Sequence, residues 1–221
     1  MADLTLERLY NTKDLQYFSM ERNHLANLVP ANTKKVLDVG CGSGVLGKIL
    51  KQTRNTEIVH GIEINEAAAK LAEKQLDRVF QVNVEDWTPE IEPGYYDAMV
   101  MGDVLEHLLD PWASLQKLAT LVRPGGLFIT SIPNVQCWRI LAPLITKGEW
   151  NYADWGLLDK GHIRFFTRKT STKLLEDSGF RITRVQRDLP LSSISGKINA
   201  LTFGLFQDFM TSHFIYLAEK K

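Results

Sequence analysis

Residues 38–44 read Asp-Val-Gly-Cys-Gly-Ser-Gly and have the composition of a turn that holds a ligand with its backbone. Glycine stands at every second position, and glycine alone combines access to left-handed backbone with the absence of a Cβ between backbone and ligand. The apolar residues 35–39 before the turn predict a buried strand, and residues 45–50 after it predict the start of a helix. Because α/β proteins bind ligands where strands end in front of helices, this turn predicts a cofactor site.

The turn by itself leaves open which cofactor binds. Residues 42–47 also read G-x-G-x-x-G, the fingerprint of dinucleotide-binding proteins, which is weak evidence when it stands alone. The stretch from Asp38 to Gly44 resembles instead the D-x-G-x-G-x-G strand end that binds S-adenosylmethionine (SAM). A tight strand-to-helix connection without any ligand is the third possibility. Residues further along the chain distinguish among these.

Two further polar positions stand at the ends of predicted strands. Glu63 lies near the end of the apolar residues 58–64, where a carboxylate can accept hydrogen bonds from both hydroxyls of a ribose. Dehydrogenases place an acid there as well, so Glu63 does not discriminate between the cofactors. Gly102 and Asp103 follow the apolar residues 96–101 in the same way.

The elements that must position these residues alternate between strand and helix from residue 34 to about residue 133, which predicts a parallel sheet with crossover helices. The alternation stops at residues 134–168, which are rich in aromatic residues and glycine and predict an inserted lid. A second irregular stretch covers residues 190–212. The predicted strands are 34–40, 58–64, 79–82, 96–101, 127–132, 180–187 and 214–218, and the predicted helices include 65–76, 110–122 and 170–178.

The composition predicts one cytoplasmic globular domain. The 221 residues are 44% hydrophobic, which suffices for one large core, and no apolar run is long enough to span a bilayer. The N-terminus is polar and acidic, unlike a secretory signal, and Cys41 and Cys137 have no metal-ligand spacing. Residues 55–110 carry 13 acids and 3 bases, whereas residues 134–187 carry 10 bases and 5 acids. The acidic residues 55–110 would suit a cationic cofactor, and the basic residues 134–187 would suit an anionic acceptor. Neither range has charges dense enough to indicate a nucleic-acid-binding groove.

Four motifs, in this order and spacing, resemble those of the class I SAM-dependent methyltransferases. They are residues 38–44, Gly61-Ile62-Glu63, residues 102–108 (Gly-Asp-Val-Leu-Glu-His-Leu) and Arg123-Pro124-Gly125-Gly126. The resemblance is strongest over residues 34–133. The tail, with Gly161-His162-Ile163-Arg164-Phe165-Phe166-Thr167, resembles a branch that includes small-molecule and quinone O-methyltransferases and many polysaccharide-associated enzymes.

The fold that this resemblance implies is a single Rossmann-like α/β domain with a doubly wound, mostly parallel seven-stranded sheet, its last strand antiparallel, plus an inserted lid. Residues 1–33 would form an N-terminal helical cover, residues 34–133 the SAM-binding core, and residues 134–168 and 190–212 the acceptor-side lid. The resemblance also implies that the turn at 83–86 contacts the adenine. The implied cofactor contacts are Asp38, Gly40, Gly42, Gly44, Glu63, Ile64, Glu85, Asp86, Gly102, Asp103, Tyr17 and Arg22.

Methyl transfer to a hydroxyl needs a base, and histidine is the side chain best suited to that role at neutral pH. Among the five histidines, His162 is our candidate base, with Asp159 as its orienting partner and packing of the lid as the alternative role. His107 follows the fourth strand and either takes part in catalysis or orders its loop. His60 lies within a strand and is expected to be structural. Asp103, Glu106 and His107 could be imagined as metal ligands, but their closeness along the chain does not by itself make an ion site, so we expect no metal.

The sequence therefore predicts a methyltransferase that uses SAM, releases S-adenosylhomocysteine (SAH) and acts on a hydroxyl of a small-molecule or glycan-like acceptor. The aromatic residues of the lid either form its core or stack on a sugar or aromatic ring. An NAD(P)-binding Rossmann oxidoreductase is one alternative, but it leaves Asp38, Gly40 and residues 102–108 unexplained. A non-catalytic SAM-binding protein is the other. The lid aromatics are Trp138, Trp150, Tyr152 and Trp155.

Overall fold

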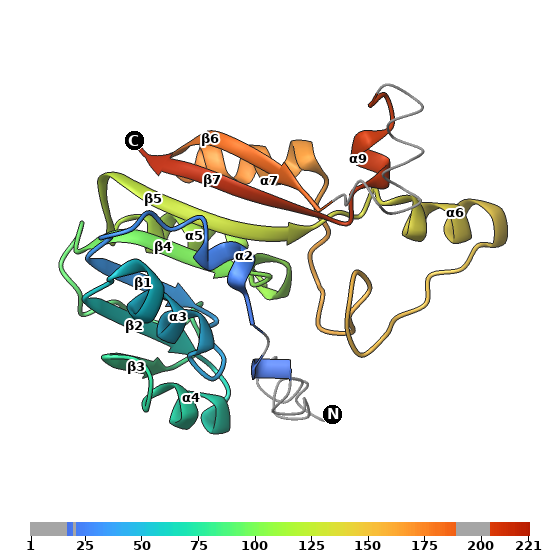
Figure 1. Cartoon of the computed structure of the whole chain (residues 1–221). Coiled ribbons are helices and arrows are strands. Elements are labelled where there is room, and N and C mark those ends of the chain that lie inside the picture. The colour runs from blue at the N-terminus through green and yellow to red at the C-terminus, as the bar shows by residue number, and fades with distance from the viewer. Residues whose placement is uncertain (1–16, 20, 189–203) are drawn as a thin grey trace.

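The computed structural model describes residues 17–19, 21–188 and 204–221 of the chain. Seven strands form one sheet in the order β3-β2-β1-β4-β5-β7-β6 (Figure 1). Strands β1 to β5 run parallel to one another, whereas β7 is antiparallel to both β5 and β6. The expected mostly parallel sheet with an antiparallel last strand is thus confirmed. The strands are β1 Lys35–Val39, β2 Ile58–Glu63, β3 Arg78–Gln81, β4 Tyr96–Gly102, β5 Val122–Pro133, β6 Phe180–Arg187 and β7 His213–Lys220.

Helices pack on both faces of this sheet. Alternate residues of a strand point to opposite faces, so that Leu37 of β1 joins a core with residues of α5 and α7, while Val36 joins a second core with residues of α2, α3 and α4. The sheet is therefore buried on both sides, as in a doubly wound fold. The helices are α2 Asn23–Ala26, α3 Val45–Arg54, α4 Glu66–Ala72, α5 Pro111–Ala119, α6 Trp138–Lys147, α7 Arg168–Asp177 and α9 Gln207–Met210, with 3₁₀ turns η1 Tyr17–Ser19 and η2 Leu105–His107.

Polar caps determine where several of these helices begin. The side chain of Asn65 accepts a hydrogen bond from the backbone N–H of Ala68, as expected for the N-cap of α4. Asp110 caps α5 in the same way, and Pro111 occupies the first helical position, where its missing N–H costs nothing. Thr167 closes a capping box at the start of α7. These caps orient the connections that leave the carboxyl edge of the sheet.

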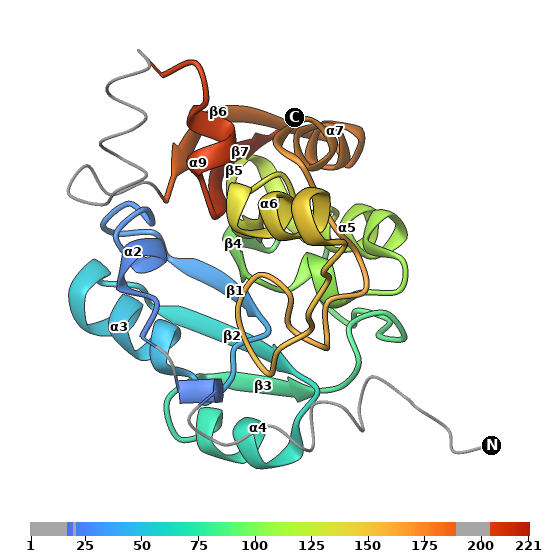
Figure 2. The ribbon, with the colours of Figure 1, turned by 90° about the vertical axis from the view of Figure 1, so that its right-hand side faces the viewer.

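Two segments differ from the sequence-based expectation. The Arg-Pro-Gly-Gly turn lies inside β5, which begins at Val122; residues 123–126 bulge out between the pairs Tyr96–Val122 and Ala98–Leu127. The lid also contains a helix that was not predicted, α6. Figure 2 shows the remaining lid residues, 148–166, lying in front of the carboxyl ends of the central strands. Part of the second lid segment, residues 189–203, lies outside the described residues, as do residues 1–16 of the expected N-terminal cover.

Among the residues that the structure describes, no helix is both long and apolar enough to cross a membrane.

Candidate functional site

A cavity opens at the carboxyl ends of β1, β2 and β4. Its walls are η1, the glycine turn after β1, the end of β2, residues 82–84 and the residues that follow β4. The three strand ends that carry the sequence motifs therefore meet around one space.

The glycine turn has the backbone that its composition predicts. Gly40, Gly42 and Gly44 have φ angles of +69°, +54° and +81°, all in the left-handed region that favours glycine. A Cβ on Gly42 would overlap the backbone carbonyl oxygen of Phe18 in η1. The turn thus packs directly under the N-terminal segment and presents bare backbone to the cavity.

Glu63 ties this turn to the end of β2. Its Oε2 accepts a hydrogen bond of 2.8 Å from the backbone N–H of Gly42, and its Oε1 accepts one of 2.9 Å from Asn65. Burial raises the pKa of the Glu63 carboxyl, and these backbone hydrogen bonds oppose the rise. Each carboxylate oxygen has about two acceptor sites. Glu63, which lines the cavity, therefore holds the turn and retains acceptor capacity for a ligand hydroxyl.

Asp38 is a buried carboxyl with an unsatisfied oxygen. The side chain is 3% exposed, and its Oδ2 has no hydrogen-bond partner among the described residues. Burial raises the pKa of Asp38 to about 7; the charge of Arg22 opposes the rise and that of Glu63 adds to it. A buried polar atom without a partner costs free energy unless a ligand or water supplies one. Because Asp38 lines the cavity, a ligand that carries a donor or a positive charge would satisfy it.

Arg22 and Asp103 face each other at the end of β4. Arg22 donates a hydrogen bond through Nη1 to the carbonyl oxygen of Gly102, and its Nη2 lies 3.9 Å from Asp103 Oδ2. Asp103 has a φ of +52°, unusual for a residue with a side chain, and its Oδ1 accepts a 2.7 Å hydrogen bond from the Ser131 hydroxyl. Tyr17 of η1 also lines this part of the cavity, and its pKa is raised by burial and by nearby negative charges.

The two acids expected at the adenine do not line the cavity. Glu85 accepts hydrogen bonds from the backbone N–H groups of Leu109 and Asp110, at 3.0 and 2.7 Å, and so orders the loop that precedes α5. Asp86 accepts from the side-chain amide of Asn83. The cavity residues of this segment are Val82, Asn83 and Val84 instead. The physical reason is local, because the two loop N–H groups need acceptors that Glu85 supplies. Ile64, by contrast, lines the cavity as expected.

His107 and His162 lie side by side between the cavity and the lid. Their ring centroids are 4.6 Å apart, and His107 lines the cavity, whereas His162 lies behind it. Burial, and for His107 also the charge of His162, lowers the pKa of His107 to about 4; burial lowers the pKa of His162 as well. Both imidazoles are therefore neutral at pH 7. His162 Nδ1 bonds the carbonyl oxygen of Leu157, while the backbone carbonyl of Asp159 accepts from the backbone N–H of His162 at 2.9 Å and the charge of Asp159 opposes the fall in the pKa of His162.

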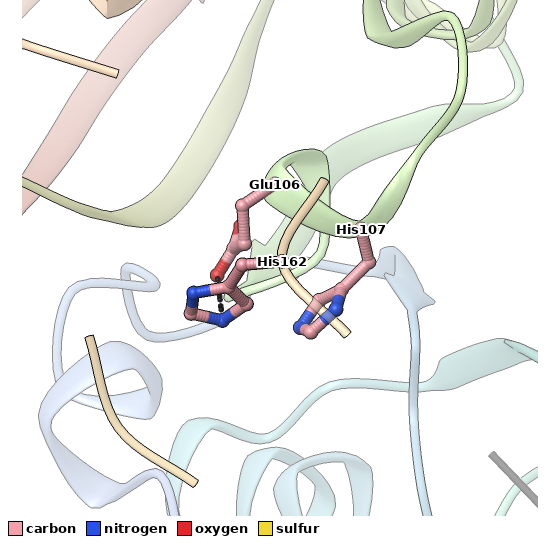
Figure 3. A group of neighbouring side chains, drawn as sticks. All are labelled: Glu106, His107 and His162. Carbon is pink, nitrogen blue, oxygen red and sulfur yellow. Dashed lines mark ion pairs between the residues drawn. The ribbon is translucent and has the colours of Figure 1, made fainter. Parts of the chain in front are cut away.

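Glu106, which the sequence offered only as a possible metal ligand and which we set aside, lies beside these histidines. Its side chain is fully buried, and burial together with the charge of Asp103 raises its pKa well above the usual range. Neither carboxylate oxygen has a hydrogen-bond partner among the described residues. The signal in the sequence was an acid directly before a histidine at the end of a buried strand. Figure 3 shows the three side chains together.

The remaining singled-out residues have roles within the fold or on its surface. His60 hydrogen-bonds the Tyr96 hydroxyl at 2.8 Å, consistent with its expected structural role. In the lid, Trp150 packs edge-on against Phe165. The other lid aromatics are exposed rather than gathered in a core, by 42% at Trp138, 51% at Tyr152 and 78% at Trp155.

Comparison with known proteins gives independent findings on this arrangement. The family model described as "Methyltransferase domain" matches residues 12–185. A protein of Cupriavidus pinatubonensis (strain JMP 134 / LMG 1197) named "Ubiquinone biosynthesis O-methyltransferase" is 38% identical over 105 residues, which are 45% of this chain and 41% of that protein. A protein of the same name from Paraburkholderia xenovorans (strain LB400) is 28% identical over 174 residues, covering 72% of this chain and 73% of that protein.

The fold has close counterparts among solved structures. A SAM dependent methyltransferase from Archaeoglobus fulgidus superimposes with a TM-score of 0.67 at 19% identity, covering 93% of this chain and 97% of that one. At this identity the likeness establishes the fold. The sequence alignments extend over less than half of the first relative's length and over about three quarters of the second's.

Proposed function

The chain belongs to the methyltransferase-domain family, and on this premise we propose that it transfers the methyl group of SAM to a hydroxyl oxygen of a small molecule. The observation that carries the proposal is the single cavity that joins the left-handed glycine turn, Glu63 and the unsatisfied Oδ2 of Asp38. An NAD(P)-dependent oxidoreductase is not favoured, because the family match and this set of residues point to the same methyl donor.

The residues of the cavity fit SAM on two observations. Gly42 lines the cavity, and a Cβ there would overlap the carbonyl oxygen of Phe18, so glycine lets the N-terminal segment close over a turn whose bare backbone suits close contact with the methionine part of the cofactor. The unpaired oxygen of Asp38 suits a donor, and the amino group of SAM is one. Glu63 would accept the ribose hydroxyls. Arg22, with Tyr17 beside it, would bind the carboxylate. Gly102 and Asp103 would lie beside the sulfonium.

Bound SAM supplies a methyl group on a positively charged sulfur, so the protein mainly has to position the acceptor and exclude water. A hydroxyl oxygen attacks well only after it has lost its proton. His107 lies on the cavity wall next to Leu108, with His162 and Glu106 behind it. We therefore propose that this histidine pair promotes deprotonation of the acceptor.

The acceptor would enter beneath the lid. The relatives named O-methyltransferases support oxygen as the methylated atom. The exposed aromatic rings of Tyr152 and Trp155 suit stacking on an aromatic ring, and a sugar ring is the second candidate. The basic surplus of residues 134–187 would favour an acceptor that carries negative charge. The two cysteines, both buried and unpaired, support our expectation of a reducing, cytoplasmic location.

Isothermal titration with SAM and with SAH tests the cofactor. We expect both to bind with a stoichiometry of one per chain and NADH to give no heat. Transfer of isotope-labelled methyl from SAM to a panel of phenols, catechols and sugars then tests the reaction, with label appearing in an ether. Absence of binding by either SAM or SAH would contradict the proposal, and binding without transfer to any acceptor would favour a non-catalytic SAM-binding protein.

A further inference from the structure

Three side chains that can bind metal ions lie close together where the lid packs against η2. Glu106, His107 and His162 each offer one ligand atom, and these atoms all lie within 4.8 Å of one another. All three side chains are buried. Figure 3 shows the carboxylate of Glu106 directed at the ring of His162, with His107 beside them. His162 Nε2 lies 3.8 Å from Glu106 Oε1.

Glu106 is the strongest sign that something is bound there. Its side chain is 0% exposed, and neither oxygen has a hydrogen-bond partner among the described residues. Its backbone carbonyl, by contrast, accepts from the N–H groups of Ile163 and Arg164, both at 3.0 Å. A buried carboxyl whose two oxygens are both unsatisfied is rare in proteins, and an ion is one of the standard explanations.

The lid fixes both histidines in the form that binds metals. His107 Nδ1 donates to the carbonyl oxygen of Gly161 at 2.9 Å, and His162 Nδ1 donates to that of Leu157 at 3.1 Å. A proton on Nδ1 leaves the lone pair on Nε2. Metal-binding histidines are commonly held by a hydrogen bond of this kind from the other ring nitrogen to a backbone carbonyl.

We propose that Glu106, His107 and His162 bind one divalent first-row transition-metal ion. Two imidazole nitrogens and one carboxylate oxygen suit ions such as Zn²⁺, Fe²⁺ or Co²⁺, whereas Mg²⁺ and Ca²⁺ prefer oxygen ligands. Ligand atoms that are about 2.0–2.2 Å from a tetrahedral ion stand about 3.4 Å apart. Small rotations of the three side chains would close the present spacing.

The chain also supplies the surroundings such a site needs. Asp103 adds negative charge next to the three ligands, and its charge acts on each of them. His107 lines the cavity, so the position that three protein ligands leave open would face the acceptor space. Three protein ligands with one open position are the usual arrangement of a catalytic metal, whereas a structural metal has four.

The role of the ion, unlike its binding, rests on the proposed methyl transfer. An acceptor hydroxyl bound at the open position would have a lowered pKa and release its proton to water. Its oxygen then forms the new bond to the methyl carbon while the carbon–sulfur bond of SAM breaks and its electron pair stays on sulfur. The products are the methyl ether, SAH and one proton. His107 and His162 would act as ligands, and neither would itself take the proton.

Co²⁺ titration of chelator-treated protein tests binding without reference to activity. We expect one Co²⁺ per chain, visible in the absorption of the ion and in the heat of binding, and a higher melting temperature of the wild type with Co²⁺. Loss of a residue that merely orients a ligand lowers metal affinity by about 10–100-fold, so Glu106→Gln, His107→Gln and His162→Gln should each lower it by more than ~100-fold. His24→Gln, at an exposed histidine, is the matched control and should titrate as the wild type does.

The outcomes separate the metal site from the reaction. Restoration of methyl transfer by metal in a protein that binds SAM with or without the ion supports both. One Co²⁺ per chain with no SAM binding would retain the site and reject the proposed function. A wild type that binds no stoichiometric Co²⁺ overturns the site even if the variants fail to fold. Unchanged Co²⁺ affinity in the three variants also overturns the site, and full methyl transfer by metal-free enzyme overturns the role of the ion in the reaction.

Discussion

Replacement of Asp38 with Asn should change how the stability of the ligand-free protein depends on pH. Asp38 is fully buried beside the glycine turn, and burial raises its pKa from 3.8 to about 7. The folded protein therefore holds a proton that the unfolded chain has already released. Between these two values, stability falls as the pH rises, because ionisation favours the unfolded chain. An asparagine has the same shape and cannot ionise.

The size of the effect follows from the two pKa values. One pKa unit corresponds to about 1.4 kcal/mol, so the difference between 3.8 and about 7 amounts to about 4 kcal/mol over the whole titration. The part between pH 5 and pH 8 is about 3 kcal/mol. The unfolding free energy of the wild type should thus fall by about this much relative to Asp38→Asn as the pH rises from 5 to 8. Titratable groups that do not interact with Asp38 contribute alike to both proteins.

Urea unfolding of both ligand-free proteins at several pH values between 5 and 8 measures this difference. SAM provides a second readout, because its positively charged amino group favours the ionised Asp38. Wild-type affinity for SAM should therefore increase as the pH rises through 7, and the affinity of Asp38→Asn should stay flat and weaker. Parallel stability curves for the two proteins would show that Asp38 is not the buried, unsatisfied carboxyl described above and would refute the argument.

Three further residues that line the cavity are tested by substitution, the first of them against a matched control variant. Gly42→Ala and Gly148→Ala both place a Cβ at a left-handed position, which costs about 1–2 kcal/mol. Only at Gly42 does the Cβ also overlap another backbone, so Gly42→Ala should destabilise the protein more than Gly148→Ala and should abolish SAM binding in titrations. Equal SAM affinity of the two variants would contradict this role of Gly42. Glu63→Gln should lose about 2 kcal/mol in urea unfolding and bind SAM at least tenfold more weakly, since an amide NH₂ cannot accept from the turn; unchanged values would remove Glu63 from the site. Arg22→Lys keeps the charge but not the paired donors, and we expect SAM affinity to drop about tenfold with little change in melting temperature, whereas an unaltered affinity would exclude Arg22 as the carboxylate partner.

The sheet could be predicted because its signals are local. Strand β6 was predicted with its observed bounds, 180–187, since a glycine precedes it and its residues favour strand. Helix α6 was missed because Pro143 stands inside it and only Ile140 is buried, which leaves little helical periodicity to detect. The turn at 123–126 was recognised, but its place as a bulge within β5 depends on pairing with β4, which lies outside any local pattern.

The residues at the strand ends around the cavity could be predicted better than the contacts of the lid, for a related reason. The carboxyl ends of parallel strands lie at the same edge of a sheet whatever the side chains are. The position of Glu63 at this edge, where it lines the cavity, could therefore be predicted from its place in the strand alone. The hydrogen bonds that Glu85 accepts from residues 109 and 110 could not be predicted, because these partners lie across a loop that the sequence does not orient. Glu106 was set aside as a ligand because its place beside His162 depends on the lid, which contributes that residue from 56 positions further along the chain.

These contacts also limit how the lid can move. Residues 161–164 are bound to η2 by three hydrogen bonds: one from His107 Nδ1 to the carbonyl oxygen of Gly161, and two from the N–H groups of Ile163 and Arg164 to the carbonyl oxygen of Glu106. A movement that lifted this part of the lid would separate His162 from Glu106 and dismantle the histidine–carboxylate cluster. Residues 150–156 carry the exposed aromatic rings of Tyr152 and Trp155. We therefore expect acceptors to enter past this outer loop while residues 157–164 stay in place, so that the reactive cluster is preformed and the outer loop governs acceptor choice.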